Sequence, residues 1–84
     1  MKARVYVSLK TTVLDPQGQA VRAALRGLGH AAIADVRQGK FFDIAIADGV
    51  SREQAQKDVE TIAHEVLANP VIEEYKVEIV EGGL

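Results

Sequence analysis

The chain contains no cysteine and no tryptophan, and it has only two histidines and four other aromatic residues. Without cysteine, disulfides and thiolate metal sites are excluded. His30 and His64 alone are too few for a typical zinc site, so we expect no metal and no cofactor. No segment reaches the roughly 18–20 apolar residues of a membrane span, and the N-terminus lacks the apolar core of a signal peptide. We therefore expect a cytoplasmic protein that makes no membrane contact.

The chain is also short, with 84 residues that we expect to form one domain over residues 1–84. A chain of this size buries only about 60–65% of the surface that its unfolded form exposes. Because disulfides and metals are excluded, self-association or docking onto a larger partner remains as the means of stabilising so small a domain.

The first half of the chain has few negative charges, and the second half has few positive charges. The net charge is −2, which argues against a nucleic-acid partner. Residues 1–40 carry seven lysines and arginines against two carboxylates, whereas residues 41–84 carry ten carboxylates against three cations. Basic and acidic strands that pair within one sheet would explain this asymmetry. A polarised docking surface is the alternative.

Hydrophobic periodicity predicts the elements of secondary structure. Residues 2–10 alternate as in a half-buried strand. Asp15 is a good N-cap and Pro16 suits the first helical position. Ser51 and Gln54 form a capping box, and Pro70 stops the helix that they begin. The expected elements are a strand over 2–10, a helix from 15 to 28, strands over 33–37 and 41–47 around a turn at 38–40, a helix from 51 to 69, and a strand over 75–80.

This order, β-α-β-β-α-β, predicts an α+β fold related to the ferredoxin-like domains, with an antiparallel sheet. Its first and last strands are expected to be neighbours, which would set Lys2 and Arg4 near Glu78 and Glu81. Two helices are expected to cover one face of the sheet and leave the other face open. We expect Tyr6, Phe41 and Val80 on that open face, where they would mediate assembly into a dimer or tetramer.

No catalytic set is visible, so we expect no catalytic residues. The cluster Arg37-Gln38-Gly39-Lys40 could hold a phosphate or the carboxylate of a partner, or it could be an ordinary solvated turn. The string Gly27-Leu28-Gly29-His30-Ala31-Ala32 has the spacing of a dinucleotide fingerprint, but it follows a helix where that fingerprint must open one.

Several short strings, in order and over nearly the whole chain, are distinctive. They are Leu9-Lys10, Val13-Leu14-Asp15-Pro16-Gln17-Gly18, Ala20-Val21, Ala24-Leu25, Leu28-Gly29, Val36-Arg37-Gln38-Gly39-Lys40 and Leu67-Ala68-Asn69-Pro70-Val71-Ile72-Glu73. In these strings the chain resembles the PurS family, the small subunits of phosphoribosylformylglycinamidine synthase in purine biosynthesis. Thr11-Thr12 departs from the residues that many members carry.

The resemblance implies a non-catalytic subunit of an ATP-dependent ligase. Its expected partners are a glutaminase subunit, which releases ammonia from glutamine, and a synthetase subunit, which consumes it. The small subunit would couple the two and support ammonia transfer. The expected partner-contact residues are Asp15, Pro16, Gln17 and Gly18, the turn residues Arg37, Gly39 and Lys40, and the segment Asn69, Pro70 and Val71.

An alternative of a different class remains open. Ferredoxin-like domains also occur as free-standing regulatory modules that bind a small metabolite at a dimer interface. Such a module would gain thermal stability from a ligand on its own, whereas a structural subunit would respond to its partner proteins.

Overall fold

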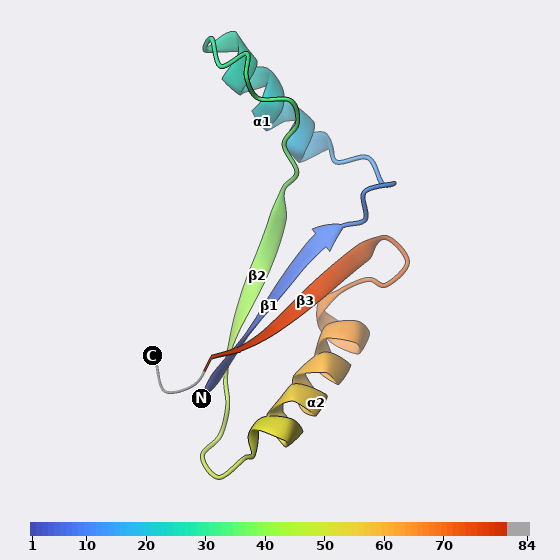
Figure 1. Cartoon of the computed structure of the whole chain (residues 1–84). Coiled ribbons are helices and arrows are strands. Elements are labelled where there is room, and N and C mark those ends of the chain that lie inside the picture. Colours follow the sequence, from blue (N-terminus) through green and yellow to red (C-terminus); the bar gives the residue numbers. More distant parts are fainter. Residues whose placement is uncertain (81–84) are drawn as a thin grey trace.

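The computed structural model describes residues 1–80 of the chain. Its elements alternate between strands and helices along the sequence (Figure 1). In chain order they are β1 (Lys2–Leu9), α1 (Pro16–Gly27), β2 (Gly39–Ala45), α2 (Arg52–Ile62), the π-helical turn η1 (Ala63–Leu67) and β3 (Glu73–Val80).

The strands form one antiparallel sheet in the order β2-β1-β3. Strand β1 pairs with β2 on one side, with Tyr6 opposite Phe41, and with β3 on the other side, with Tyr6 opposite Lys76. Because side chains alternate between the faces of a strand, the even-numbered residues of β1 share one face of the sheet.

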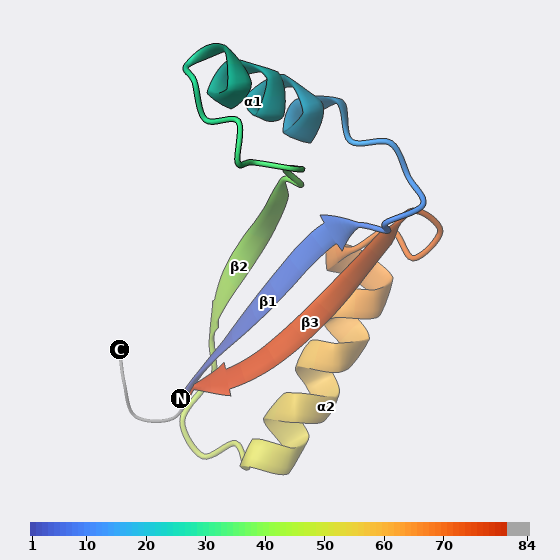
Figure 2. The ribbon, with the colours of Figure 1, turned by 45° about the horizontal axis from the view of Figure 1, so that its top comes forward.

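The core lies on the opposite face of β1, where Ala3, Val5 and Val7 are almost fully buried. Helix α2 covers this face, and its Val59, together with Ala63 of η1, belongs to the same buried cluster. Figure 2 shows α2 lying beside β3, which passes in front of one end of the helix. Among residues 1–80, no helix lies on the face of the sheet that carries Tyr6.

The chain between β1 and β2, residues 10–38, stands apart from this core. We call it the arm, and we call residues 1–9 and 39–80 the body. Helix α1 projects beyond the end of the sheet on the side away from α2 (Figure 1), and it forms no extended contact with any strand or with α2. Residues 28–38, the return segment, run back along α1 to the start of β2.

The α+β class, the antiparallel sheet and the two helices are confirmed, with β1 between its expected neighbour β3 and β2. The expected strand over residues 33–37 does not form, because the described chain offers it no strand to pair with. The expected turn at residues 38–40 is also wrong, since Gly39 and Lys40 already belong to β2. Of the two helices, α2 alone covers the sheet.

The apolar stripe of α1 shows the same difference between expectation and structure. Two helices were expected to cover one face of the sheet, but Val21 and Leu28 on the apolar side of α1 are 42% and 75% exposed. Helix periodicity correctly predicts that these residues share a face, and it contains no information about which surface covers that face.

Charge pairing within the sheet follows the expected register in part. Arg4 lies opposite Glu78 on β3 and Asp43 on β2, and its Nε donates to Asp43 Oδ1 at 2.8 Å. Lys2 Nζ lies 3.4 Å from the same carboxylate. Arg4 and Lys2 therefore lower the pKa of Asp43, with the hydrogen bond from Arg4 as the main cause. Glu81 lies outside the described residues.

Candidate functional site

The candidate partner-contact residues meet at one place, the junction of the arm with the sheet. We call this junction the arm base. The start of α1 and the end of the return segment both enter it, and the turn before β3 lies beside it, since Lys10 N donates to Ile72 O at 2.9 Å. The three strings that were predicted separately are therefore neighbours in space.

Asp15 connects the two ends of the arm. Its side chain is buried, with one oxygen accepting from Gly18 N at 2.9 Å and the other from Gln38 N at 2.7 Å. The first bond caps α1, as the sequence predicts, and the second holds the return segment against the helix. Both bonds favour the charged carboxylate, and so, aided by the nearby Arg37, they lower the pKa of Asp15 despite its burial.

Arg37 makes a second connection across the arm base. Its Nη2 donates to the carbonyl oxygens of Lys10 and Val13 at 2.9 and 2.8 Å, and both carbonyls belong to the segment that leads out of β1. Arg37, which belongs to the return segment, thus holds in place the segment that leads from β1 to α1. Its guanidinium is committed to these carbonyls, which sets it apart from a cation in an open turn.

Two glycines allow close approach at the same junction. A Cβ atom on Gly18 would collide with the carbonyl oxygen of Val36 in the return segment. A Cβ atom on Gly39 would lie 2.9 Å from Val7 O in the neighbouring strand. At Gly18 the absence of a side chain is therefore what lets the return segment lie directly on α1.

A cleft of about 450 Å³ opens beside these contacts. Its walls come from the end of β1, the start of α1 and the start of β2, and they include Gln17, Lys40 and Glu73. Lys40 is exposed, and Glu73 accepts a hydrogen bond from Asn69 N at 2.7 Å. Opposite charges with a polar amide suit contacts with another protein surface better than acid–base chemistry.

The turn before β3 presents an apolar tip next to the cleft. Asn69 closes the turn, because its side-chain oxygen accepts from Val71 N at 3.1 Å and its carbonyl accepts from the backbone of Glu73 at 2.7 Å. Pro70 follows the π-helical turn, whose closing bond runs from Ala68 N to Ala63 O. Val71 is left 77% exposed, as a contact residue would be.

The dimer-face candidates Tyr6, Phe41 and Val80 share the open sheet face, as their registers require. The rings of Tyr6 and Phe41 lie 6.2 Å apart, and the Arg4 guanidinium lies 4.7 Å above the Phe41 ring. Phe41 is nevertheless 55% exposed. The open face therefore carries an aromatic centre with charged groups around it.

The described residues hold no group of three or more side chains that could bind a metal ion. Within the same residues, no helix has both the length and the hydrophobicity that a membrane crossing requires. Sequence reasoning missed the arm, and with it Arg22 and Arg26 on α1, whose only signal was the excess of cations in the first half of the chain.

Comparison with known proteins connects these features to a family. The model of the PurS family, described as phosphoribosylformylglycinamidine (FGAM) synthase, matches residues 2–81. The chain is 46% identical to the PurS subunit of phosphoribosylformylglycinamidine synthase from Mycobacterium leprae, over 90% of this chain and 91% of that protein. It is 42% identical to the subunit of the same name from Bacillus subtilis, over 95% and 93%.

Solved structures agree with the sequence comparison. A crystal form of Bacillus subtilis PurS has a TM-score of 0.82 and covers 95% of this chain and 98% of its own. A chain in the Thermotoga maritima PurLQS structure has a TM-score of 0.84 at 29% identity, covering 94% and 95%. Coverage of this extent includes the arm, so the arm is part of the shared fold. This chain therefore belongs to the PurS family of phosphoribosylformylglycinamidine synthase.

Proposed function

We propose that this chain is a non-catalytic subunit of a phosphoribosylformylglycinamidine synthase complex in the cytoplasm. In this proposal it joins a glutaminase subunit to an ATP-dependent synthetase subunit and supports ammonia transfer between them. The observation that carries the proposal is membership of the PurS family across residues 2–81. The Thermotoga maritima relative supports it, because a chain of this fold is found there in an assembly called PurLQS.

The chemistry of ammonia explains why such a subunit is useful. Ammonia that escapes into water near pH 7 is largely protonated, and the ammonium ion is no nucleophile. A route closed to water keeps it reactive. A protein without reactive groups contributes by excluding water and by fixing the positions of the two enzymes that make and use ammonia.

The proposed partner contacts are at the arm base and the adjoining turn. Asp15, Gly18 and Arg37 set the shape of the arm base from within. Gln17 and Lys40 are exposed in the wall of the cleft, and Val71 is exposed in the adjoining turn, so all three are available to a partner. The proposed self-association surface is the open sheet face with Tyr6, Phe41 and Val80.

Reconstitution with the matching synthetase and glutaminase tests the proposal. We expect glutamine-dependent product formation to require this chain, whereas the reaction supplied with ammonium salt needs it far less. A Lys40→Ala, Val71→Asp double variant should assemble less well, with Lys57→Ala on α2 as the control. If neither the glutamine nor the ammonia reaction responds to this chain, the coupling role is wrong.

The cleft of about 450 Å³ favours one second candidate, a regulatory module that binds a small metabolite. It requires that a metabolite raise the melting temperature of the purified chain without any partner protein. We expect stabilisation by the partner subunits instead.

A further inference from the structure

We propose that Asp48 is a site of spontaneous isomerisation, at which the backbone rearranges slowly from an aspartyl to an isoaspartyl linkage through a succinimide with Gly49. The site lies in the turn between β2 and α2, at the end of the body opposite the arm (Figure 1). The inference goes beyond the proposed function. It also identifies the class of enzyme that recognises the product, a methyltransferase that acts on isoaspartyl carboxylates.

The rearrangement needs only Asp48, Gly49 and water. The backbone nitrogen of Gly49 attacks the side-chain carboxyl carbon, so a C–N bond forms and the C–OH bond of the carboxyl group breaks. The amide proton and the hydroxyl leave as water, and a five-membered succinimide remains. Water then opens the ring. Opening at the side-chain carbonyl restores aspartate, whereas opening at the main-chain carbonyl routes the chain through the side chain and frees an α-carboxylate. Nothing is oxidised or reduced.

The first support is the residue that follows Asp48. Gly49 has no side chain, and a Cβ atom built on it would meet no atom within 4 Å, so its nitrogen is uncrowded. The nitrogen of a proline carries no hydrogen to lose, and a β-branched side chain crowds the nitrogen of its own residue. These two obstacles apply to the other aspartates of the chain, which are followed by Pro16, Val36, Ile44 and Val59.

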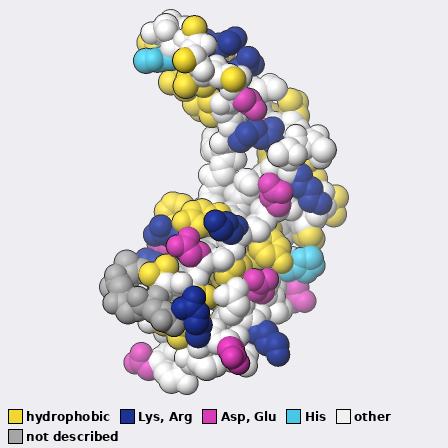
Figure 3. Space-filling view, viewed as in Figure 1, with side chains coloured by type: hydrophobic (Ala, Val, Ile, Leu, Met, Phe, Trp, Pro, Cys, Tyr) yellow, Lys and Arg dark blue, Asp and Glu magenta, His cyan; other side chains and the backbone are white. Residues whose placement is uncertain are grey.

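The second support is that the turn leaves this backbone free. Asp48 and Gly49 are both exposed and belong to no helix or strand. Within residues 1–80, the backbone nitrogen of Gly49 donates no hydrogen bond. Asp43 and Asp58, in contrast, lie inside β2 and α2, where regular structure holds the backbone. Figure 3 shows few hydrophobic side chains at the end of the body away from the arm, so the turn is open to the water that the reaction requires.

The chain contains an internal control for the effect of the glycine. The sequence Ala-Ile-Ala-Asp occurs twice, ending once at Asp35 and once at Asp48. Both copies have the same pattern of exposure along their residues, and both aspartates are exposed. The first copy continues with Val36 and the second with Gly49. A difference in isomerisation between the two aspartates therefore cannot come from the residues that precede them.

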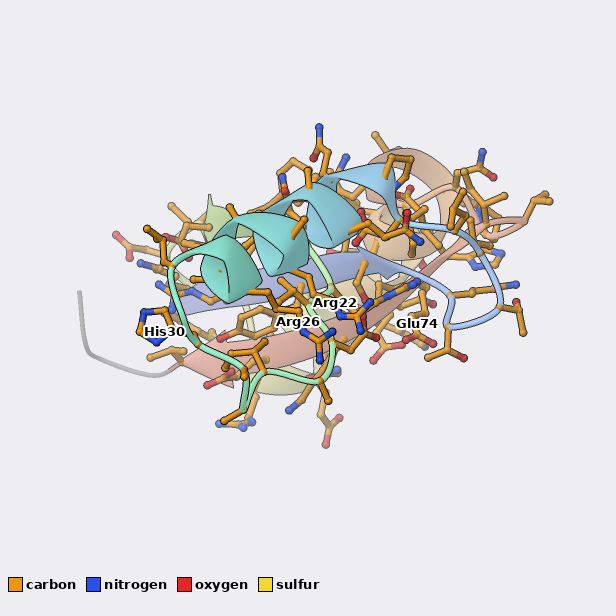
Figure 4. All side chains as sticks on the ribbon, turned by 90° about the horizontal axis from the view of Figure 1, so that it is seen from above. Arg22, Arg26, His30 and Glu74 are labelled. Atoms are coloured by element: carbon orange, nitrogen blue, oxygen red, sulfur yellow. The ribbon has the colours of Figure 1, made fainter. Side chains whose placement is uncertain are left out.

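The two copies also differ in how the chain around them is held. Asp35 lies in the return segment, which runs beside α1 on the side to which Arg22 and Arg26 project (Figure 4). The carbonyl oxygen of the next residue, Val36, lies directly against Gly18 of α1. The branched side chain and this packing both favour isomerisation in the second copy over the first.

Isomerisation lengthens the main chain between β2 and α2 by one methylene group. Both ends of this connection are held, because Ile46 N donates to Met1 O at 3.1 Å and Ser51 Oγ accepts from Gln54 N at 3.1 Å. The extra group must therefore be accommodated between these two bonds. We expect the N-terminal cap of α2 to loosen, while the arm keeps its contacts.

Incubation of the purified full chain near neutral pH in water enriched in heavy oxygen tests the proposal. Each ring opening leaves one heavy oxygen in the peptide, and mass spectrometry locates it. Methylation by an isoaspartyl methyltransferase with labelled S-adenosylmethionine identifies the isoaspartyl product. We expect both signals at Asp48, and at Asp35 in the same sample a rate lower by about tenfold or more, because Val36 is branched. Equal rates at the two aspartates, or no isoaspartate at Asp48, would overturn the proposal.

Two substitutions at the exposed position 48 test the succinimide route itself. Asp48→Glu requires a six-membered ring, which closes far more slowly, so the methyltransferase signal should disappear. Asp48→Asn keeps the five-membered ring and releases ammonia in place of water, so isoaspartate should form faster than in the natural chain. Circular dichroism checks that both variants keep the fold. A signal that persists in Asp48→Glu, or one that does not rise in Asp48→Asn, contradicts the route.

Discussion

The body and the arm of this chain are held in place by different forces. In the body, β1 is paired on both sides, and its Val5 and Val7 are buried under Val59 of α2. In the arm, the described residues that are buried are Gly18 and Asp15. Hydrophobic packing therefore builds the body, and hydrogen bonds from a few polar residues set the position of the arm.

This difference separates folding from assembly. The body has a continuous core that is available to the single chain. The arm has an exposed apolar face and a hydrogen-bonded base, so its own chain sets its position, and we expect a partner chain to cover its apolar face in the assembled complex. Regions with few buried apolar contacts open at lower free energy than a core does. Substitutions in the body should accordingly affect folding, whereas substitutions in the arm should affect assembly.

The largest effect is expected in the core of the body. Val5→Asp places an unpaired charge between the sheet and α2, and we expect the chain to lose its fold. Leu28→Asp on the arm is the matched change, because Leu28 is 75% exposed in the single chain. It should keep the circular dichroism of the natural chain and lose self-association. Equal unfolding by both changes would remove the distinction between body and arm.

Two glycine substitutions on α1 test whether the close contact between α1 and the return segment positions the arm. Gly18→Ala drives a Cβ atom into the carbonyl of Val36 and should separate the return segment from α1. Gly27→Ala meets no atom within 4 Å and should stabilise the helix by up to about 1 kcal/mol. Complex formation, followed by light scattering, should be lost in the first variant and kept in the second. Similar behaviour of the two variants would contradict the role assigned to the contact.

Removal of the Asp15 carboxylate should act on the arm alone. Asp15→Ala loses the bonds to Gly18 N and Gln38 N, and we expect amide exchange over residues 16–38 to become about tenfold faster. Exchange in β1 and α2 should stay unchanged. Asp35→Ala, at an exposed position in the return segment, is the control and should change neither region. An increase spread evenly over the whole chain would argue against a local role.

The smallest effect is expected from acid. The pKa of Asp15 lies below its ordinary value of 3.8 in the folded chain. Its contribution is therefore fully present above pH 3.8 and is lost as the pH falls through the lowered folded value. The carboxylate of Asp43, lowered mainly by its hydrogen bond from Arg4, follows the same sign. NMR spectra recorded on acidification should show the amides of Gly18 and Gln38, which donate to this carboxylate, shifting only below pH 3.8 in the natural chain, and this late change should be absent in Asp15→Asn.

Much of this molecule could be predicted from its sequence because local rules decided it. The alternation of apolar and polar residues predicted β1. The Asp15-Pro16 pair predicted the start of α1, and the capping box at Ser51 predicted the start of α2. In each case the governing contacts lie within a few residues of one another.

The unpredicted parts depend on contacts between distant residues. Ile33 to Arg37 have the composition of a strand, but the described chain gives them no neighbour to pair with. Arg37 could be read as an open cation, because its acceptors at Lys10 and Val13 are more than twenty residues away. The roles of Gln17, Lys40 and Val71 in partner contacts stay predictions, because they depend on other proteins.

Amide hydrogen exchange measured at several protein concentrations shows whether the arm depends on a partner chain for its stability. If the arm is stabilised by a second chain, protection of residues 16–27 should fall on dilution below the dissociation constant of the dimer, while β1, β3 and α2 keep theirs. If α1 exchanges as slowly as the sheet at every concentration, the arm is stable by itself. Its proposed dependence on assembly would then be wrong.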